Sequence, residues 1–298
     1  MKFIITSFLI VLTGLGMAAN AQESLTPEEE QLIAEMTQAW DSVTPQTGDV
    51  TLADGIATLH VPDEFVYFSP QDSETVLVNL WGNVPGAGTG TLGMLFPADL
   101  TPFDDDAWAV TVEYTEDGYV SDEGAEDIDY SDLLSQMKSE TRDASAERVK
   151  QGYEPISLVG WASEPYYDQS AHILHWAKEI KFGDQDVNTL NYDIRVLGRK
   201  GVLVLSFIAS MAQKDVIDSQ IDSVLSVAEF NQGSRYQDFD PDLDEVAAYG
   251  LGALVAGKLA AKAGLFAIIL VFLKKFGVFI VVGVGALVSK LFKRKKAA

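Results

Sequence analysis

Hydrophobic residues recur along the chain with two spacings, one helical and one alternating. Spacings of three and four residues, as at Leu32, Ile33, Met36 and Trp40, are typical of a helix with one buried face. Alternation of apolar and polar residues is typical of a strand with one face on the core. The pattern predicts helices over 24–40, 73–81, 131–151 and 214–228, and strands over 56–61, 65–68, 91–96, 108–114, 156–162, 172–182, 189–197 and 202–209.

The order of these segments indicates the fold class. Four predicted strands follow one another between 156 and 209, and the turn residues Gly198-Arg-Lys-Gly201 make the last two a hairpin. Helices precede and follow this run of strands. Such an order is typical of an α+β domain, in which helices cover an antiparallel sheet. The stretch from the first helix to Thr51 is rich in turn residues, and no repeat or long linker requires a second domain.

The N-terminus has the three parts of a secretory signal peptide. Lys2 gives a short basic region, residues 3–12 form an apolar run, and Ala19-Asn20-Ala21 provides a small-x-small cleavage site. The apolar run is too short to cross about 30 Å of hydrocarbon at about 1.5 Å per helical residue. We therefore expect residues 1–21 to be removed after Ala21.

The C-terminus is apolar beyond Glu245 as far as the basic cluster Lys293-Arg-Lys-Lys296. One tilted helix over 263–289 would place two lysines near the middle of the bilayer. A hairpin of two spans would return the basic cluster to the outside, against the positive-inside rule. We expect one net crossing, made by either 263–273 or 276–292. Small residues between 250 and 264 are compatible with self-association of the tail.

Acidic and basic residues are concentrated in different parts of the chain. All 44 acidic residues lie between Gln22 and Glu245, together with eleven Lys and Arg, whereas residues 246–298 carry nine Lys and Arg and no acid. A domain this acidic repels nucleic acid, so we expect no nucleic-acid partner. Cysteine is absent from the sequence, which excludes disulfides, thiolate metal sites and a lipidated N-terminal cysteine.

Few residues suggest chemistry. His172 and His175 are candidate metal ligands, but a strand would point them to opposite faces, so we expect structural histidines. The segment 88–93 matches a dinucleotide-binding pattern, yet it neither follows a strand nor opens a helix, so we expect a flexible loop. The acidic runs lack the spacing of a calcium-binding loop. We therefore predict no catalytic residue, no metal site and no cofactor.

Several short segments rich in aromatic residues and glycine follow one another over most of residues 56–209. They are Leu80-Trp-Gly-Asn83, Gly93-Met-Leu-Phe-Pro97, Trp108 and Tyr114, Asp117-Gly-Tyr-Val120, Ile128-Asp-Tyr130, Val159-Gly-Trp-Ala162, Pro165-Tyr-Tyr-Asp168, His172 with Trp176-Ala-Lys-Glu179, Leu190-Asn-Tyr192 and Arg195-Val-Leu-Gly-Arg-Lys-Gly201. In this order the segments resemble a family of bacterial membrane-anchored envelope proteins known as a domain of unknown function, family 2167. The resemblance implies a signal peptide and a C-terminal anchor, and it implies no activity or site.

Together these features predict a signal peptide (1–21), an acidic periplasmic α+β domain (22–245) and a tail (246–298) that crosses the bacterial inner membrane once to a cytoplasmic end. We expect a binding or structural module that contacts another envelope protein. Trp161, Tyr166 and Tyr167 are the candidate contact patch. The alternatives are an envelope hydrolase that uses Asp/Glu acid–base pairs and a sensor of a small ligand or divalent cation.

Overall fold

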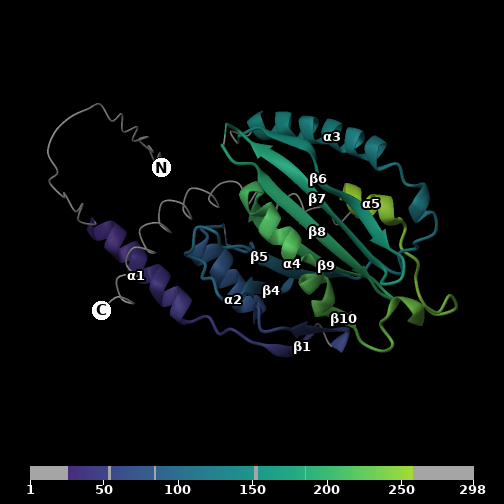
Figure 1. The fold of residues 1–298 in the computed structure, drawn as a ribbon, viewed down its shortest axis with the longest axis horizontal. Coiled ribbons are helices and arrows are strands. Elements are labelled where there is room, and N and C mark those ends of the chain that lie inside the picture. The colour runs from purple at the N-terminus through teal and green to yellow at the C-terminus, as the bar shows by residue number, and fades with distance from the viewer. Residues whose placement is uncertain (1–25, 53–54, 84, 151–153, 185, 258–298) are drawn as a thin grey trace.

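A seven-stranded antiparallel sheet forms the centre of the computed structural model, which describes residues 26–52, 55–83, 85–150, 154–184 and 186–257 (Figure 1). The strand order is β3-β4-β5-β9-β8-β7-β6, so the last four strands form a meander. This arrangement confirms the predicted α+β class and the predicted hairpin between β8 and β9. The strands are β3 (Phe65–Phe68), β4 (Thr91–Pro97), β5 (Ala109–Thr115), β6 (Ile156–Asp168), β7 (Ile173–Phe182), β8 (Thr189–Leu197) and β9 (Val202–Ser210).

One face of the sheet is covered by a helix and by a second, smaller sheet. The helix is α4 (Lys214–Val227), and the small sheet has the order β1-β2-β10, with bounds Gly48–Leu52, Ala57–Val61 and Ala228–Phe230. Because side chains alternate along a strand, every second residue of β5, β8 and β9 faces this layer. Val110, Ile194 and Phe207 are fully buried there against Leu59 and Ile221.

Helices also cover the opposite face. The long helix α3 (Tyr130–Lys150) lies along β6, and the short helix α5 (Leu251–Ala256) packs beside it (Figure 1). Near β4 the cover is α1 (Pro27–Asp41), α2 (Pro70–Glu74) and the π-helical turn η2 (Thr75–Leu80). Short 3-10 turns, η3 (Ala125–Asp127), η4 (Met211–Gln213) and η5 (Tyr236–Asp238), join the remaining elements.

The structure departs from the sequence predictions at several elements, among them β1, the helix over 73–81 and β6. The stretch predicted as turns up to Thr51 ends in strand β1, which pairs antiparallel with β2. The single helix predicted over 73–81 begins earlier, after the N-cap Ser69, and changes to π-helical geometry at Thr75. Strand β6 runs six residues beyond its predicted end at Ala162, because bulges interrupt the alternation on which the prediction depended.

The predicted signal peptide and most of the predicted tail concern residues that the structure does not describe. Residues 1–25, with the predicted signal peptide, and residues 258–298, with most of the predicted tail, lie outside the described residues. Within the part of the chain that is described, none of the helices has the length and apolarity that crossing a bilayer requires. The first residues of the predicted tail include α5, whose Leu251, Leu254 and Val255 are buried against the domain.

Candidate functional site

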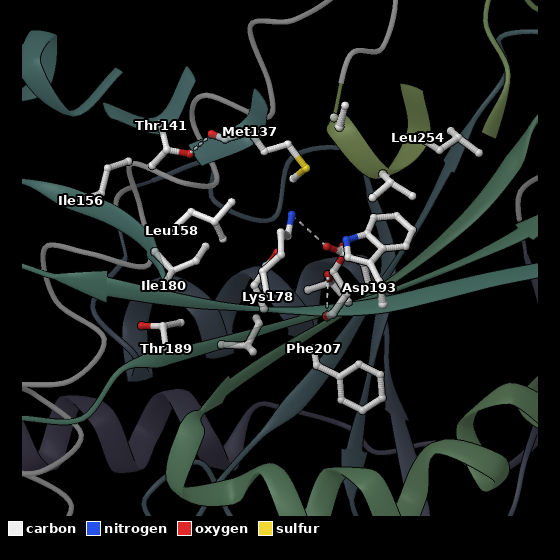
Figure 2. A pocket seen from close by; sticks show the side chains of 18 of the residues that line it. Met137, Thr141, Ile156, Leu158, Lys178, Ile180, Thr189, Asp193, Phe207 and Leu254 are labelled. Atoms are coloured by element: carbon white, nitrogen blue, oxygen red, sulfur yellow. Dashed lines mark hydrogen bonds and ion pairs between the residues drawn. The ribbon is translucent and has the colours of Figure 1, made fainter. Parts of the chain in front are cut away.

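A cavity of about 340 Å³ lies between the sheet and the helices α3 and α5 (Figure 2). Its volume falls within the range of about 300–1,000 Å³ that is common for small-molecule sites. Met137 and Thr141 come from α3, and Leu254 comes from α5. The sheet contributes Leu158 from β6 and Ile180 from β7. The wall is therefore mainly apolar.

The floor of the cavity is a row of polar side chains that crosses the sheet. Alternate residues of β8, Asn191, Asp193 and Arg195, face the cavity, while the residues between them face α4. Strand β7, which pairs with β8, adds Lys178, and β5, on the far side of β9, adds Glu113. Because strand pairing places these side chains beside one another, residues that are up to 82 positions apart in sequence share one site.

Asp193 is the centre of this row. Its Oδ1 accepts hydrogen bonds from Arg195 Nη2 at 3.1 Å and from Ser206 Oγ at 2.8 Å. Its Oδ2 lies 3.5 Å from Lys178 Nζ. The side chains of Asp193 and Arg195 are 7% and 5% exposed, and that of Lys178 is 18% exposed. Two cations thus share one carboxylate away from bulk water.

Burial shifts the pKa values of this cluster in different directions. It raises the pKa of Asp193, but Arg195, Lys178 and the Ser206 hydroxyl lower that pKa more, so it lies below its ordinary value. Burial lowers the pKa of Lys178, and the nearby Arg195 lowers it further against the opposing effect of Asp193. Burial also raises the pKa of Glu113. Asp193 is therefore held ionised, while the charged forms of Lys178 and Glu113 are disfavoured.

Two buried polar atoms beside the cavity have no hydrogen-bond partner among the described residues. They are the indole Nε1 of Trp176 and the amide Oδ1 of Asn83, and both residues line the cavity. The guanidinium of Arg195 lies 5.0 Å from the centre of the Trp176 ring and occupies its face, but this contact leaves the N–H unmatched. Buried polar groups are usually hydrogen-bonded, so these two mark a place where a partner is missing.

The segment that carries α5 is fixed to the domain by charge. The acidic run 238–245 packs on the basic hairpin turn, where Arg199 Nε donates to Asp244 Oδ2 at 2.6 Å. This hydrogen bond is the main reason that the pKa of Asp244 is lowered. The chain then pairs with Tyr119, whose N–H donates to the carbonyl of Glu245 at 2.8 Å. These contacts position α5 at the cavity wall.

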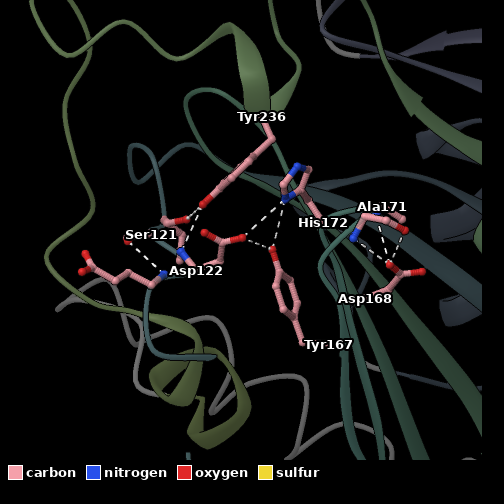
Figure 3. A network of polar contacts seen from close by, with 10 residues as sticks. Ser121, Asp122, Tyr167, Asp168, Ala171, His172 and Tyr236 are labelled. Carbon is pink, nitrogen blue, oxygen red and sulfur yellow. Dashed lines mark hydrogen bonds and ion pairs between the residues drawn. The ribbon is translucent and has the colours of Figure 1, made fainter. Parts of the chain in front are cut away.

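A second polar network lies at the turn between β6 and β7 (Figure 3). Tyr167 OH donates to Asp122 Oδ2 at 2.7 Å and lies 3.2 Å from Nδ1 of His172. Tyr236 OH donates to the carbonyl of Val120 and accepts from the N–H of Asp122. Burial raises the pKa of both tyrosines. The network ties three distant segments together.

The three residues of the predicted contact patch all lie on β6, but in different surroundings. Tyr166 is 59% exposed, and its ring meets the edge of His175. Tyr167 is half-buried in the network around Asp122. Trp161 is half-buried as well, donates to the carbonyl of Tyr130 at 3.3 Å and lines a shallow hollow of about 470 Å³. The contact patch stays a prediction, with Tyr166 as its most exposed member.

The two candidate metal ligands point to opposite sides of the sheet. His172 contacts Tyr236, whereas Nδ1 of His175 lies 2.9 Å from the hydroxyl of Tyr192 on the side of α4. Within the described part of the chain, no group of three or more acidic residues and histidines is arranged to hold a metal ion.

The glycine-rich segment has an internal partner. Both oxygens of the Glu74 carboxylate accept backbone N–H groups, from Gly86 and Gly88, each at 2.6 Å. A carboxylate therefore already occupies the amides that a phosphate would need in a nucleotide site.

Sequence reasoning missed the polar row because its residues lie within strands that are otherwise ordinary. The alternation of polar and apolar residues in 189–197 is typical of a strand with one face in water. The available signal was the set of charges inside predicted strands, Lys178, Asp193 and Arg195, on an α+β fold whose sheet was expected to be covered by helices.

Comparison with known proteins places the chain in a family without showing its activity. Two solved structures are similar. Cyanobacterial PsbP (CyanoP) from Synechocystis sp. PCC 6803 matches at 14% identity over 64% of this chain and 93% of that one, with a TM-score of 0.34. A mutant of the protein Mog1 matches at 11% identity over 63% of this chain and 96% of that one, with a TM-score of 0.32. No curated protein matches. Over residues 44–285 the chain matches the family described as a protein of unknown function, DUF2167, and it belongs to that family.

Proposed function

We propose that this protein is a membrane-tethered, extracytoplasmic binding module whose binding site is the cavity between the sheet and the helices α3 and α5. The observation that carries the proposal is the combination of an apolar wall with a buried charged floor. Ligand sites are typically concave and mostly apolar, with a few convergent polar groups that have perturbed pKa values. Lys178, Asp193 and Glu113 are such groups.

The proposed location rests on the sequence. The signal peptide over 1–21 carries the acidic domain across the inner membrane, and the apolar tail beyond α5 holds it there with its basic end in the cytoplasm. A tether confines the domain near the bilayer and raises its effective concentration for ligands and envelope proteins at that surface. Tyr166 on β6 is the exposed aromatic residue that we propose for contact with such a protein.

The location is tested with protease in cells whose outer membrane has been opened. A C-terminal tag should remain protected in the cytoplasm, while the acidic domain is digested from outside. Protection of the domain itself, or release of the intact protein by a salt wash, would refute the tether.

The binding site is tested by native mass spectrometry of the full-length protein in lipid nanodiscs, purified from its own cells. Thr141 lines the cavity on α3, and Ser139 is exposed on the same helix and does not line it. We expect the unmodified protein and Thr141→Phe to differ by one bound small molecule, because the phenyl ring fills the cavity. Ser139→Phe is the matched control and should retain the molecule. A complex that survives Thr141→Phe would place the ligand elsewhere.

A hydrolase is the second candidate, and the raised pKa of Glu113 favours it. A carboxyl group with a raised pKa beside an ionised carboxylate is the arrangement that acid–base catalysis uses. The oxygens of Asp193 are already bonded to Arg195, Ser206 and Lys178, however, which leaves no free base. Turnover of a bound molecule that Glu113→Gln abolishes without displacing the molecule would establish the enzyme.

A further inference from the structure

We propose that the cavity takes a monocarboxylate with an apolar body, its carboxylate bound between Lys178 and Trp176. This inference rests on the proposed binding function and names the class of ligand. It follows from three properties of the lining: an indole N–H without an acceptor among the described residues, a largely buried ammonium whose one acidic partner there is Asp193, and an apolar wall.

The two donors are the Lys178 ammonium and the Trp176 indole. An ammonium carries three N–H donors, and the partner that the described residues give Lys178 is Asp193, at 3.5 Å. Trp176 is 1% exposed, and its Nε1 has no hydrogen-bond partner in the described part of the chain. Both groups donate, so the ligand that matches them supplies acceptors. A carboxylate has two oxygens, one for each donor.

The position of Lys178 favours a single negative charge on the ligand. Lys178 and Arg195 lie beside one carboxylate, Asp193. Two further acids line the cavity: burial raises the pKa of Glu113, and the side chain of Glu140 is exposed. A carboxylate bound at Lys178 offsets the burial that lowers the pKa of this lysine.

The ammonium and the indole also lie near each other in the cavity. Lys178 Nζ lies over the Trp176 ring, 5.9 Å from its centre. A carboxylate that accepts hydrogen bonds of about 2.9 Å through each of its two oxygens can contact two donors on neighbouring side chains. Figure 2 shows the Lys178 side chain rising from the sheet into the space below Met137, so the ammonium points into the cavity.

The rest of the lining is apolar and favours a ligand with a hydrocarbon body. Above the charged floor the wall consists of Met137, Leu158, Ile180, Leu254 and Val255. An apolar body buried there gains about 0.8 kcal/mol for each CH₂ group removed from water. A small hydrophilic anion would bind the floor but leave this wall against water, so an amphipathic carboxylate matches the whole cavity.

The test measures binding of labelled decanoate, decanol and decylamine to the full-length protein in lipid nanodiscs, with uptake by empty nanodiscs subtracted. Lys178→Met removes the ammonium and keeps a side chain of similar length. Lys181→Met, an exposed site on the same strand, is the matched control. We expect decanoate to bind best. Lys178→Met should weaken decanoate binding by about tenfold to a hundredfold, as for the loss of a hydrogen bond to a charged group, and Lys181→Met should not.

The results separate this inference from the function on which it rests. Decanol binding that Lys178→Met leaves unchanged is expected, because the apolar wall remains. If decanol or decylamine binds as tightly as decanoate and Lys178→Met changes none of them, the cavity binds ligands but the carboxylate class is wrong. If none of the three binds, and native mass spectrometry finds no bound molecule, the binding function itself fails.

Discussion

Replacing Lys178 by methionine is expected to stabilise the ligand-free protein, although the residue is charged, buried and ion-paired. At 3.5 Å from Asp193 Oδ2, the attraction in a medium of effective dielectric constant about 20 is about 5 kcal/mol. Removing an ammonium from water costs several kcal/mol, and Arg195 repels it as well. The lowered pKa of Lys178 indicates that the two unfavourable contributions exceed the attraction.

Asp193→Asn should have the opposite effect. It leaves Lys178 and Arg195 buried without a carboxylate, and breaking a buried pair in this way costs about 3–5 kcal/mol. In Lys178→Met, by contrast, Asp193 keeps its hydrogen bonds to Arg195 and Ser206. We therefore expect Lys178→Met to raise the stability, by no more than the roughly 1–4 kcal/mol that replacing a whole buried ion pair by apolar groups can gain.

Urea unfolding of the full-length protein in nanodiscs, followed by tryptophan fluorescence, measures both effects without ligand. A higher urea midpoint for Lys178→Met and a lower one for Asp193→Asn is the expected pair of results. If both variants lose stability by similar amounts, the ion pair of Lys178 with Asp193 stabilises the sheet. The ammonium is then satisfied by the protein itself and gives no support for a bound carboxylate.

Three further outcomes follow from residues away from the cavity floor. Burial raises the pKa of Tyr192 from 10.0 to about 12, so the stability that its neutral hydroxyl contributes is complete below pH 10 and is lost as the pH rises to about 12. This loss amounts to about 3 kcal/mol, and urea unfolding measured against pH should show that Tyr192→Phe abolishes it. Gly201→Ala would put a methyl group 2.1 Å from the carbonyl oxygen of Thr115 and should lower stability by about 1–3 kcal/mol, whereas Gly160→Ala, which meets open space, should change the urea midpoint little. Glu74→Gln should speed hydrogen exchange at the amides of the glycine-rich loop, and unchanged exchange would show that the carboxylate does not hold them.

The sequence predicts the strands and helices well where burial follows a simple period. The amphipathic helix α4 and the alternating strand β5 lie where the spacing of their apolar residues indicates. Prediction fails where long-range pairing decides the structure. The short strands β1 and β10 form because each pairs with β2, and neither has a pattern long enough to be recognised.

The cavity is out of reach of sequence reasoning for a related reason. The polar face of β8 is the same whether water or α3 covers it, because alternation reports only that the two faces differ. Whether Asp193 is exposed or buried depends on the packing of α5, a helix of six residues from a segment that the sequence suggests belongs to the membrane tail. The carboxylate clusters that sequence alone can propose are, by contrast, too numerous to discriminate.

The position of α5 connects one wall of the cavity directly to the chain that follows it. Gly257 ends this helix in left-handed geometry, with φ of 72°, and lines the cavity together with Leu254 and Val255. The next residue is Lys258, so any pull on the polypeptide beyond this point acts directly on one wall of the cavity. Pulling the chain away from the sheet would separate α5 from the cavity and admit water to the charged floor. Without such a pull, α5 would stay packed against the domain. With the tether that we propose, occupancy of the cavity and tension in the chain beyond Gly257 would therefore oppose each other through the six residues of α5.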